Sequence, residues 1–165
     1  MDLGFIKVSA ASPRVHLAQP IKNAQAVRDA LFSAQDDGVQ ILAFPELFLT
    51  GYTCADLFSQ QQLLDSTEKA LAWLLAQTKS CGVVAAIGLP VHSEGRLYNC
   101  AAVIRNGHIL GVVPKMYIPN VREYYEKRWF SPGHNARTQT VALCRNTVPF
   151  GRLLFNLGEG ITLGV

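Results

Sequence analysis

Two residues of opposite charge stand directly after apolar segments of this chain. Glu46 follows the apolar run at residues 39–44 and the turn residue Pro45, and Lys115 follows the apolar segment at residues 109–114. A carboxylate against an apolar wall is expected to have a raised pKa, which suits a group that exchanges protons near neutral pH. A nearby ammonium group can stabilise that carboxylate and a developing oxyanion. If both segments are strands that end at one sheet edge, the pair forms half of an acyl-transfer site.

Each of these residues also has a simpler interpretation. Glu46 could cap the segment that follows it, or pair with a surface cation. Lys115 could be an ordinary surface lysine at the start of a long loop. Residue type and spacing alone leave these alternatives open.

The pattern of apolar residues predicts the elements that would position this pair. We expect one helix that begins after an N-cap at Asn23 and ends at Gly38, and a second at residues 59–80. The dipeptide Asn106-Gly107 predicts a two-residue hairpin turn, and Pro90 is expected to end a strand. The expected strands are residues 3–10, 39–44, 83–89, 96–105, 108–114, 138–143, 152–155 and 161–165. Residues 114–135 have no clean period, and an irregular segment of that length is often functional.

This order of elements fits a single α/β domain with a mixed sheet and both helices on one of its faces. The strands are apolar almost throughout, so the second face also has to be covered. We therefore expect a helix-sheet-sheet-helix sandwich, of which residues 1–165 form the amino-terminal part.

The composition argues against several classes of function. The net charge of +3 arises without any run of like charges, so binding to nucleic acid or to a membrane surface is not expected. No apolar run approaches the ~20 residues of a membrane span, and the four cysteines form no C-x-x-C pair. We expect a cytoplasmic protein with reduced cysteines. The four histidines share no metal-ligand spacing and there is no phosphate-binding loop, so neither a metal site nor a cofactor is expected in this chain.

Several motifs resemble those of the nitrilase, or carbon-nitrogen hydrolase, superfamily, and the likeness covers essentially the whole chain. Within the superfamily, Gly51-Tyr52 and the segment at residues 122–130 are most similar to the amino-terminal glutaminase domains of glutamine-dependent NAD+ synthetases. The motifs are Phe44-Pro45-Glu46-Leu47, Gly51-Tyr52, Tyr98-Asn99-Cys100-Ala101, Pro114-Lys115-Met116-Tyr117-Ile118-Pro119-Asn120, and Arg122-Glu123-Tyr124-Tyr125-Glu126-Lys127-Arg128-Trp129-Phe130 with Gly133.

The resemblance implies a four-layer α-β-β-α sandwich and a Glu-Lys-Cys triad that hydrolyses the side-chain amide of glutamine. Glu46 matches the general base, Lys115 the lysine that stabilises the tetrahedral intermediate, and Glu126 a second glutamate that supports both. Tyr52 and Tyr125 are candidates for binding glutamine, although Tyr125 could equally pack in the core.

Two departures from the family pattern affect these expectations. The family nucleophile is a cysteine in a strand-end motif that follows a segment similar to residues 160–165, so we expect both that strand and the synthetase domain to lie outside residues 1–165. We expect none of the four cysteines to replace it, and the chain to be inactive alone. Val121 stands where the family usually has tyrosine, which puts the substrate contacts of that ring in doubt.

In the parent enzyme that the resemblance implies, ammonia from glutamine is used for ATP-dependent conversion of deamido-NAD+ to NAD+. ATP, Mg²⁺ and deamido-NAD+ would bind to the synthetase domain. Incomplete coverage of the sheet also predicts a homo-oligomer. Two alternatives remain: another amidase or carbamoylase of the superfamily, and a non-catalytic association module.

Overall fold

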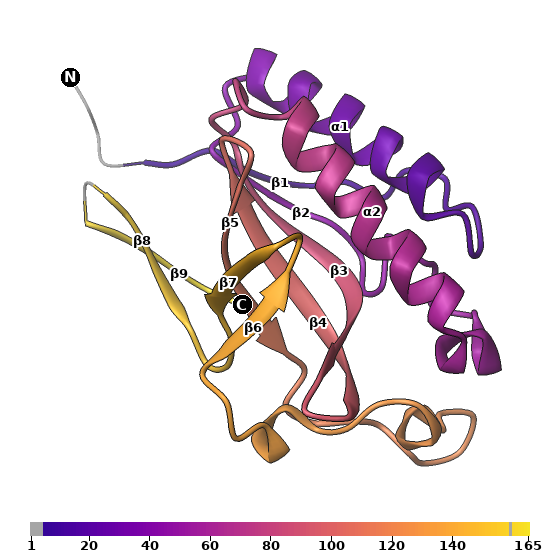
Figure 1. The fold of residues 1–165 in the computed structure, drawn as a ribbon. Coiled ribbons are helices and arrows are strands. Elements are labelled where there is room, and N and C mark those ends of the chain that lie inside the picture. Colours follow the sequence, from indigo (N-terminus) through magenta and orange to yellow (C-terminus); the bar gives the residue numbers. More distant parts are fainter. Residues whose placement is uncertain (1–4, 159) are drawn as a thin grey trace.

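The centre of the protein is a five-stranded mixed sheet in the order β1-β2-β3-β4-β5 (Figure 1). We describe residues 5–158 and 160–165 of a computed structural model. β1 and β2 run parallel to each other and to β3, whereas β4 is antiparallel to β3 and to β5. The strands are β1 (Val8–Ala10), β2 (Ile41–Ala43), β3 (Val84–Ser93), β4 (Arg96–Arg105) and β5 (His108–Pro114). This mixed sheet confirms the predicted α/β class.

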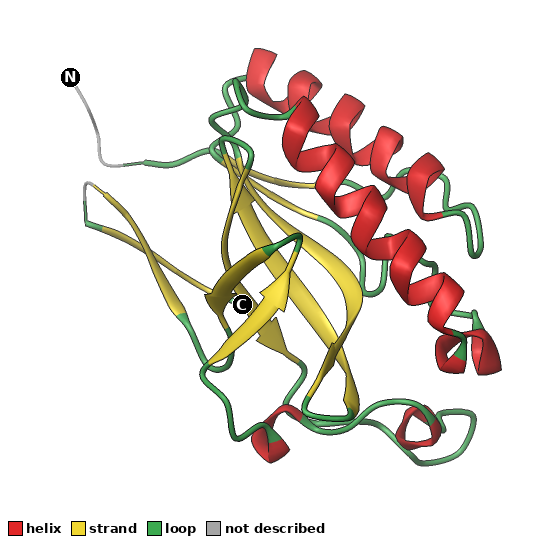
Figure 2. Ribbon diagram, viewed as in Figure 1, coloured by secondary structure: helices red, strands yellow, loops and turns green. Residues whose placement is uncertain are grey.

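Two long helices cover one face of this sheet (Figure 2). They are α1 (Pro20–Asp36) and α2 (Gln61–Gln77), and their apolar stripes pack against β2, β3 and β4 in the main core. The predicted N-cap at Asn23 is wrong, because α1 begins at Pro20, whose fixed φ suits a first turn. Asn23 is instead buried within the helix. Its side chain bonds to the backbone of His16 and to the carbonyl of Leu49.

The hairpin between β4 and β5 confirms the turn predicted at Asn106-Gly107. Both residues have positive φ, at 51° and 74°, as a tight two-residue turn requires. The prediction that Pro90 ends its strand is wrong, since β3 continues to Ser93. β2 pairs with β3 only as far as Ala86, so the missing N–H of Pro90 falls on a free side of the strand and leaves no ladder bond unmade.

A second hairpin, β6 (Thr140–Leu143) and β7 (Asn146–Pro149), forms a separate two-stranded sheet that meets β5 at a bridge between Val112 and Phe150. The strand β7 was not predicted from the sequence. Its turn consists of Cys144 and Arg145, which have φ values of 51° and 63°. Residues other than glycine, asparagine and aspartate rarely adopt this backbone conformation. The pair Cys144-Arg145 is therefore not a dipeptide from which a tight turn is predicted. The backbone N–H of Cys144 donates to Glu68 of α2, which ties the turn to the helix layer.

The hairpin β8 (Leu154–Gly158) and β9 (Ile161–Gly164) lies on the sheet face opposite the helices (Figure 1). Phe155 packs with Val84, Val103 and Val113, which alternate along their strands with residues of the main core. Gly111 permits this close approach, since a Cβ there would lie 2.5 Å from Leu153 Cδ1. Elsewhere this face is not covered: Val8, whose register partner Ile41 packs in the same cluster, is exposed.

Three elements of the expected sandwich are therefore present: a helix layer, the main sheet and a hairpin on its second face. In the part of the chain that the structure describes, no helix is long and apolar enough to cross a membrane.

Candidate active site

The candidate site lies at the sheet edge where β2 and β5 both end. Because β5 is antiparallel to β4, which is antiparallel to β3, it points in the same direction as β2. Glu46 follows β2 through a short turn, and Lys115 follows β5 directly. The backbone N–H of Lys115 donates to the carbonyl of Asn99 at 2.7 Å, so β4 fixes the point at which the lysine leaves the sheet.

The turn that carries Glu46 lies directly on β3 at Gly88. A Cβ at Gly88 would be 2.2 Å from the backbone nitrogen of Leu47 and 2.7 Å from the carbonyl oxygen of Pro45. Only a residue without a side chain allows this approach. Leu47, the next residue after Glu46, has a φ of 51° and is fully buried. Backbone strain of this kind persists only where the surrounding packing enforces it.

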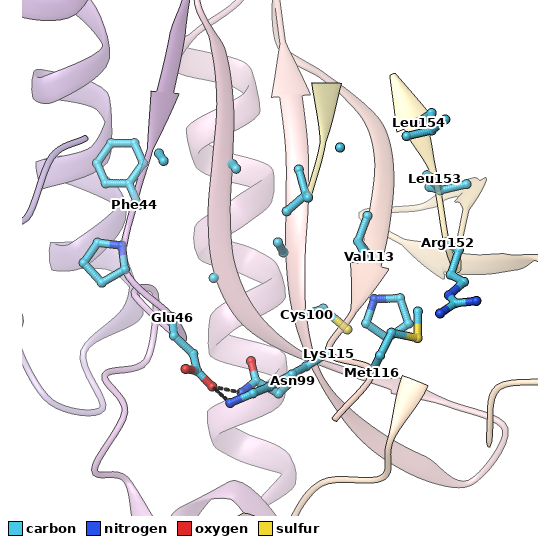
Figure 3. A pocket seen from close by; sticks show the side chains of 18 residues that line it. Phe44, Glu46, Asn99, Cys100, Val113, Lys115, Met116, Arg152, Leu153 and Leu154 are labelled. Carbon is cyan, nitrogen blue, oxygen red and sulfur yellow. Dashed lines mark hydrogen bonds and ion pairs between the residues drawn. The ribbon is translucent and has the colours of Figure 1, made fainter. Parts of the chain in front are cut away.

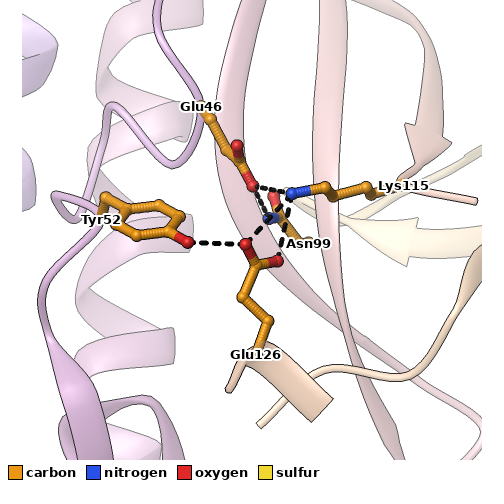
Figure 4. Close-up of polar contacts among 5 residues, drawn as sticks. All are labelled: Glu46, Tyr52, Asn99, Lys115 and Glu126. Carbon is orange, nitrogen blue, oxygen red and sulfur yellow. Dashed lines mark hydrogen bonds and ion pairs between the residues drawn. The ribbon is translucent and has the colours of Figure 1, made fainter. Parts of the chain in front are cut away.

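The ammonium group of Lys115 bridges two carboxylates (Figure 4). Its Nζ lies 2.6 Å from Oε1 of Glu46, and 3.2 and 3.1 Å from the two carboxylate oxygens of Glu126. The predicted convergence of Glu46 and Lys115 is thus confirmed, and Glu126 joins them. The three residues come from three separate segments of the chain.

Asn99 is a member of this cluster that was not identified as a site residue from the sequence. Its side-chain amide donates to the same oxygen of Glu46 that Lys115 contacts, and the residue is buried in β4. Asn99 belongs to the motif Tyr98-Asn99-Cys100-Ala101, but the alternation of side chains along β4 does not indicate which of these residues faces the sheet edge. Two donors therefore orient one oxygen of the Glu46 carboxylate.

Glu126 is the most enclosed carboxylate of the cluster, with 4% of its side chain exposed. It lies in η2 (Glu126–Arg128), a single 3₁₀ turn within the irregular segment 114–135. The hydroxyl of Tyr52 donates to its Oε1 at 2.6 Å. Buried charges require both a counter-ion and hydrogen bonds, and Lys115 and Tyr52 supply them here.

The surroundings of Glu46 differ from the apolar enclosure that was expected. About 40% of its side chain is exposed, and its carboxylate is held by a cation and an amide. Burial acts to lower the pKa of Lys115, but its hydrogen bonds to the two carboxylates outweigh this and raise that pKa above its usual value. Burial and the bond to Glu126 raise the pKa of Tyr52 well above that of an ordinary tyrosine.

A cavity of about 890 Å³ opens beside this cluster on the second face of the sheet (Figure 3). Glu46, Asn99 and Lys115 lie at one end of it, and its walls are mainly small and apolar. Gly88 and Ala101 form part of its floor, and Leu153 and Leu154 of the β8 segment line the opposite side. Its apolar walls belong to the sheet face that the expected sandwich would cover, and its polar groups converge at the end where Glu46 and Lys115 lie.

Comparison with known families identifies the family of this chain. The family model for carbon-nitrogen hydrolases matches residues 8–153. The chain belongs to the carbon-nitrogen hydrolase family. Among curated relatives, the glutamine-dependent NAD(+) synthetase of Mycobacterium tuberculosis (strain ATCC 25618 / H37Rv) is 40% identical over 153 residues, which are 92% of this chain and 22% of that protein. The enzyme of the same name from Mycobacterium leprae is 35% identical over 165 residues, covering 98% of this chain and 24% of that protein.

Solved structures give the same fold for this carbon-nitrogen hydrolase chain. A glutamine-dependent NAD(+) synthetase from Cytophaga hutchinsonii superposes with a TM-score of 0.86 at 29% identity, over 96% of this chain and 27% of that one. An amidase from Nesterenkonia sp. superposes with a TM-score of 0.64 at 20% identity, over 82% of this chain and 50% of that one. The chain thus spans less than a third of the synthetases it matches.

The two tyrosines that were predicted to bind substrate have different contacts in the structure. Tyr52 contacts the charged cluster of this carbon-nitrogen hydrolase through Glu126. Tyr125 is exposed and its ring lies tilted against that of Trp129, with ring centroids 5.1 Å apart, so the alternative of core packing is wrong for it. Both line a smaller cavity of about 240 Å³ beside Glu126. Val121 is exposed in the same irregular segment.

None of the four cysteines has the setting of an activated thiol. Burial raises the pKa of Cys54, Cys100 and Cys144, to about 12 for Cys144. Cys81 is buried beneath the helices, and all four are free thiols. Cys100 lines the large cavity, but its thiol is almost fully buried and its pKa lies well above the usual range. A nucleophilic cysteine needs a lowered pKa and access to substrate.

Proposed function

We propose that residues 1–165 supply the general base and the oxyanion-stabilising lysine of an amidase site that releases ammonia from glutamine. The observation that carries this proposal is the contact of Lys115 with both Glu46 and Glu126 at the end of an apolar cavity. The names of the relatives support glutamine as the substrate and NAD+ synthesis as the use of the ammonia.

In the proposed reaction, Glu46 takes the proton of a cysteine thiol, and the thiolate attacks the amide carbon of glutamine. Lys115 stabilises the resulting oxyanion while Glu126 keeps the lysine charged and in place. Glu46 then returns the proton to the leaving nitrogen, so that ammonia departs and a γ-glutamyl thioester remains. Water, deprotonated by Glu46, hydrolyses the thioester and restores the thiol.

The thiol in this proposal is not one of the four cysteines of residues 1–165, because burial opposes the reactive form of each thiol whose pKa is shifted and Cys81 is enclosed in the main core. These residues alone are therefore expected to release no ammonia from glutamine. ATP, Mg²⁺ and deamido-NAD+ are assigned to a synthetase domain. In the described residues no three His, Cys, Asp or Glu side chains are grouped to hold a metal ion, and the sequence has no phosphate-binding loop.

The test measures ammonia release from glutamine by the gene product that contains residues 1–165, with Glu46→Gln and Lys115→Met variants. Each variant should lose about 10²–10⁴-fold in glutamine-supported turnover, as loss of a general base or an oxyanion donor does. NAD+ formation from added ammonia should be unchanged, which separates a damaged amidase site from a misfolded enzyme. Equal glutamine turnover in wild type and Glu46→Gln would overturn the proposal.

A different substrate would leave the chemistry intact but change the outcome of this experiment. Hydrolysis of simple aliphatic amides in preference to glutamine, still dependent on Glu46, would identify another amidase of the family. Absence of hydrolysis of any amide, with self-association of the purified protein, would favour the association module instead.

A further inference from the structure

A second set of polar contacts joins the segment that carries Tyr52 to the segment that carries Glu126. The carboxylate of Asp56 accepts hydrogen bonds from Nε and Nη2 of Arg128, at 2.6 and 2.9 Å, and from the indole nitrogen of Trp129 at 2.9 Å. Asp56 lies in η1 (Ala55–Ser59), shortly after Tyr52. Arg128 lies two residues after Glu126, and Trp129 lies three residues after it. The two connected segments are thus those that place Tyr52 and Glu126.

Glu126 needs such support because its own element is too short to hold it. η2 is one turn of three residues, and turns of this length have little stability without external contacts. The backbone N–H of Glu126 reaches the carbonyl of Pro119 at 3.3 Å. A small rotation of η2 would move the carboxylate of Glu126 away from the ammonium group of Lys115.

The backbone and the apolar packing around Asp56 also show that surrounding contacts hold this region in place. Ala55, the residue before it, has a φ of 50°, which L residues rarely adopt and which persists only where surrounding contacts hold it. Phe58 of the same turn packs against Trp129 and Phe130, with ring centroids 5.9 and 4.9 Å apart. Apolar packing and the three hydrogen bonds to Asp56 therefore fix η1 and η2 against each other.

We propose that Asp56 is a positioning residue for the amidase site: through Arg128 and Trp129 it holds η2 so that Glu126 faces both Lys115 and Tyr52. The inference rests on the proposed function, since it assigns Asp56 a part in the same reaction. The competing interpretation is a surface ion pair that only fastens a loop and has no effect at the cluster.

The structure provides a matched control for this distinction. Asp29 is 66% exposed, as Asp56 is, and also accepts hydrogen bonds from two nitrogens of an arginine, Arg28. It lies in α1, away from the cluster. Asp29→Asn and Asp56→Asn therefore remove equally exposed, arginine-paired carboxylates, of which only one is joined to η2.

The test follows the pKa of Lys115 by ¹⁵N NMR of its Nζ, and that of Tyr52 by ¹³C NMR of its ring, in residues 1–165. Asp56→Asn and Asp56→Ala should shift both pKa values down toward those of ordinary lysine and tyrosine, because both depend on the position of Glu126. Asp29→Asn should shift neither. If both pKa values stay at their wild-type positions in Asp56→Asn, Asp56 does not position Glu126.

Trp129→Phe guards against a variant that fails to fold, since it removes the indole donor but keeps an aromatic ring next to Phe58. It should shift the same two pKa values in the same direction by a smaller amount, and no shift would count against the inference. These readouts need no glutamine turnover. Shifted pKa values, together with no glutamine hydrolysis by the gene product that contains residues 1–165, would therefore overturn the proposed function alone. Hydrolysis by that gene product, together with unshifted pKa values, would overturn only the role of Asp56.

Discussion

Lys115 Nζ lies 2.6 Å from Glu46 Oε1, although 69 positions separate the two residues along the chain. The contact arises because β2 and β5 point the same way and both end at the edge of the sheet where Asn99 lies. A cation between two carboxylates is costly to assemble unless each charge is satisfied by the others. The arrangement is therefore expected to respond strongly when one member is removed.

Loss of Lys115 should destabilise the protein more than loss of the Glu46 charge. Lys115→Met leaves the enclosed carboxylate of Glu126 without its counter-ion, and should lower the free energy of unfolding by about 3 kcal/mol. Glu46→Gln affects a carboxylate that is 40% exposed and should cost less than about 1 kcal/mol. Urea unfolding of both variants measures the difference. Equal losses would show that Glu126 does not depend on Lys115.

Gly88→Ala should displace the turn that carries Glu46. The added methyl group would lie 2.2 Å from the backbone of Leu47, and overpacking of this kind costs about 1–3 kcal/mol. The control is Gly82→Ala, where the nearest atom would be 4.0 Å away. The expected result is a lowered Lys115 pKa and a lower unfolding free energy in Gly88→Ala only. Similar effects of the two variants would contradict the close approach at Gly88.

Two tyrosine substitutions should differ in their effect on stability. Tyr52→Phe removes a hydrogen bond to the buried carboxylate of Glu126 and should cost about 1.5–3 kcal/mol. Tyr98→Phe should be neutral or stabilising, because the Tyr98 hydroxyl is buried without a hydrogen-bond partner among the described residues. Thermal unfolding under identical conditions compares them. A large loss in Tyr98→Phe would reveal a partner for that hydroxyl.

Stability should decline at alkaline pH. Tyr52 and Lys115 have higher pKa values in the folded than in the unfolded chain, so their contribution is complete below the unfolded values of about 10 and is lost as pH rises through the folded ones. Cys54, Cys100 and Cys144 act with the same sign, beginning near the usual thiol pKa of about 8.5. Unfolding free energies between about pH 8 and 11 test this. The decline above pH 10 should be shallower in Tyr52→Phe, and an identical slope would contradict the shifted tyrosine.

Much of this architecture could be predicted from local patterns. Helical spacing predicted α2, and Asn106-Gly107 predicted its hairpin turn, because each signal lies within a few adjacent residues. The convergence of Glu46 and Lys115 followed from two apolar strands with charged residues at their exits. The resemblance to a known family, rather than residue pattern, supplied the role of Glu126.

The missed features depend on contacts between distant segments. Asn23 resembles an N-cap locally, but its amide satisfies backbone groups of His16 and Leu49 from inside α1. Pro90 is tolerated within β3 only because β2 is short. Asn99 reaches Glu46 through the register of β4, which the alternation of side chains does not fix. In each case, contacts with residues that are distant in the sequence decide the structural role of the residue, and its local sequence pattern does not.

The central claim is that Glu46 and Glu126 both hold the ammonium group of Lys115, and its pKa tests this most directly. ¹⁵N NMR titration of Lys115 Nζ should give a value above that of ordinary lysine in the wild-type chain. Glu46→Gln and Glu126→Gln should each lower it, because each removes one carboxylate partner. A wild-type value at or below that of ordinary lysine, unchanged in both variants, would contradict the account.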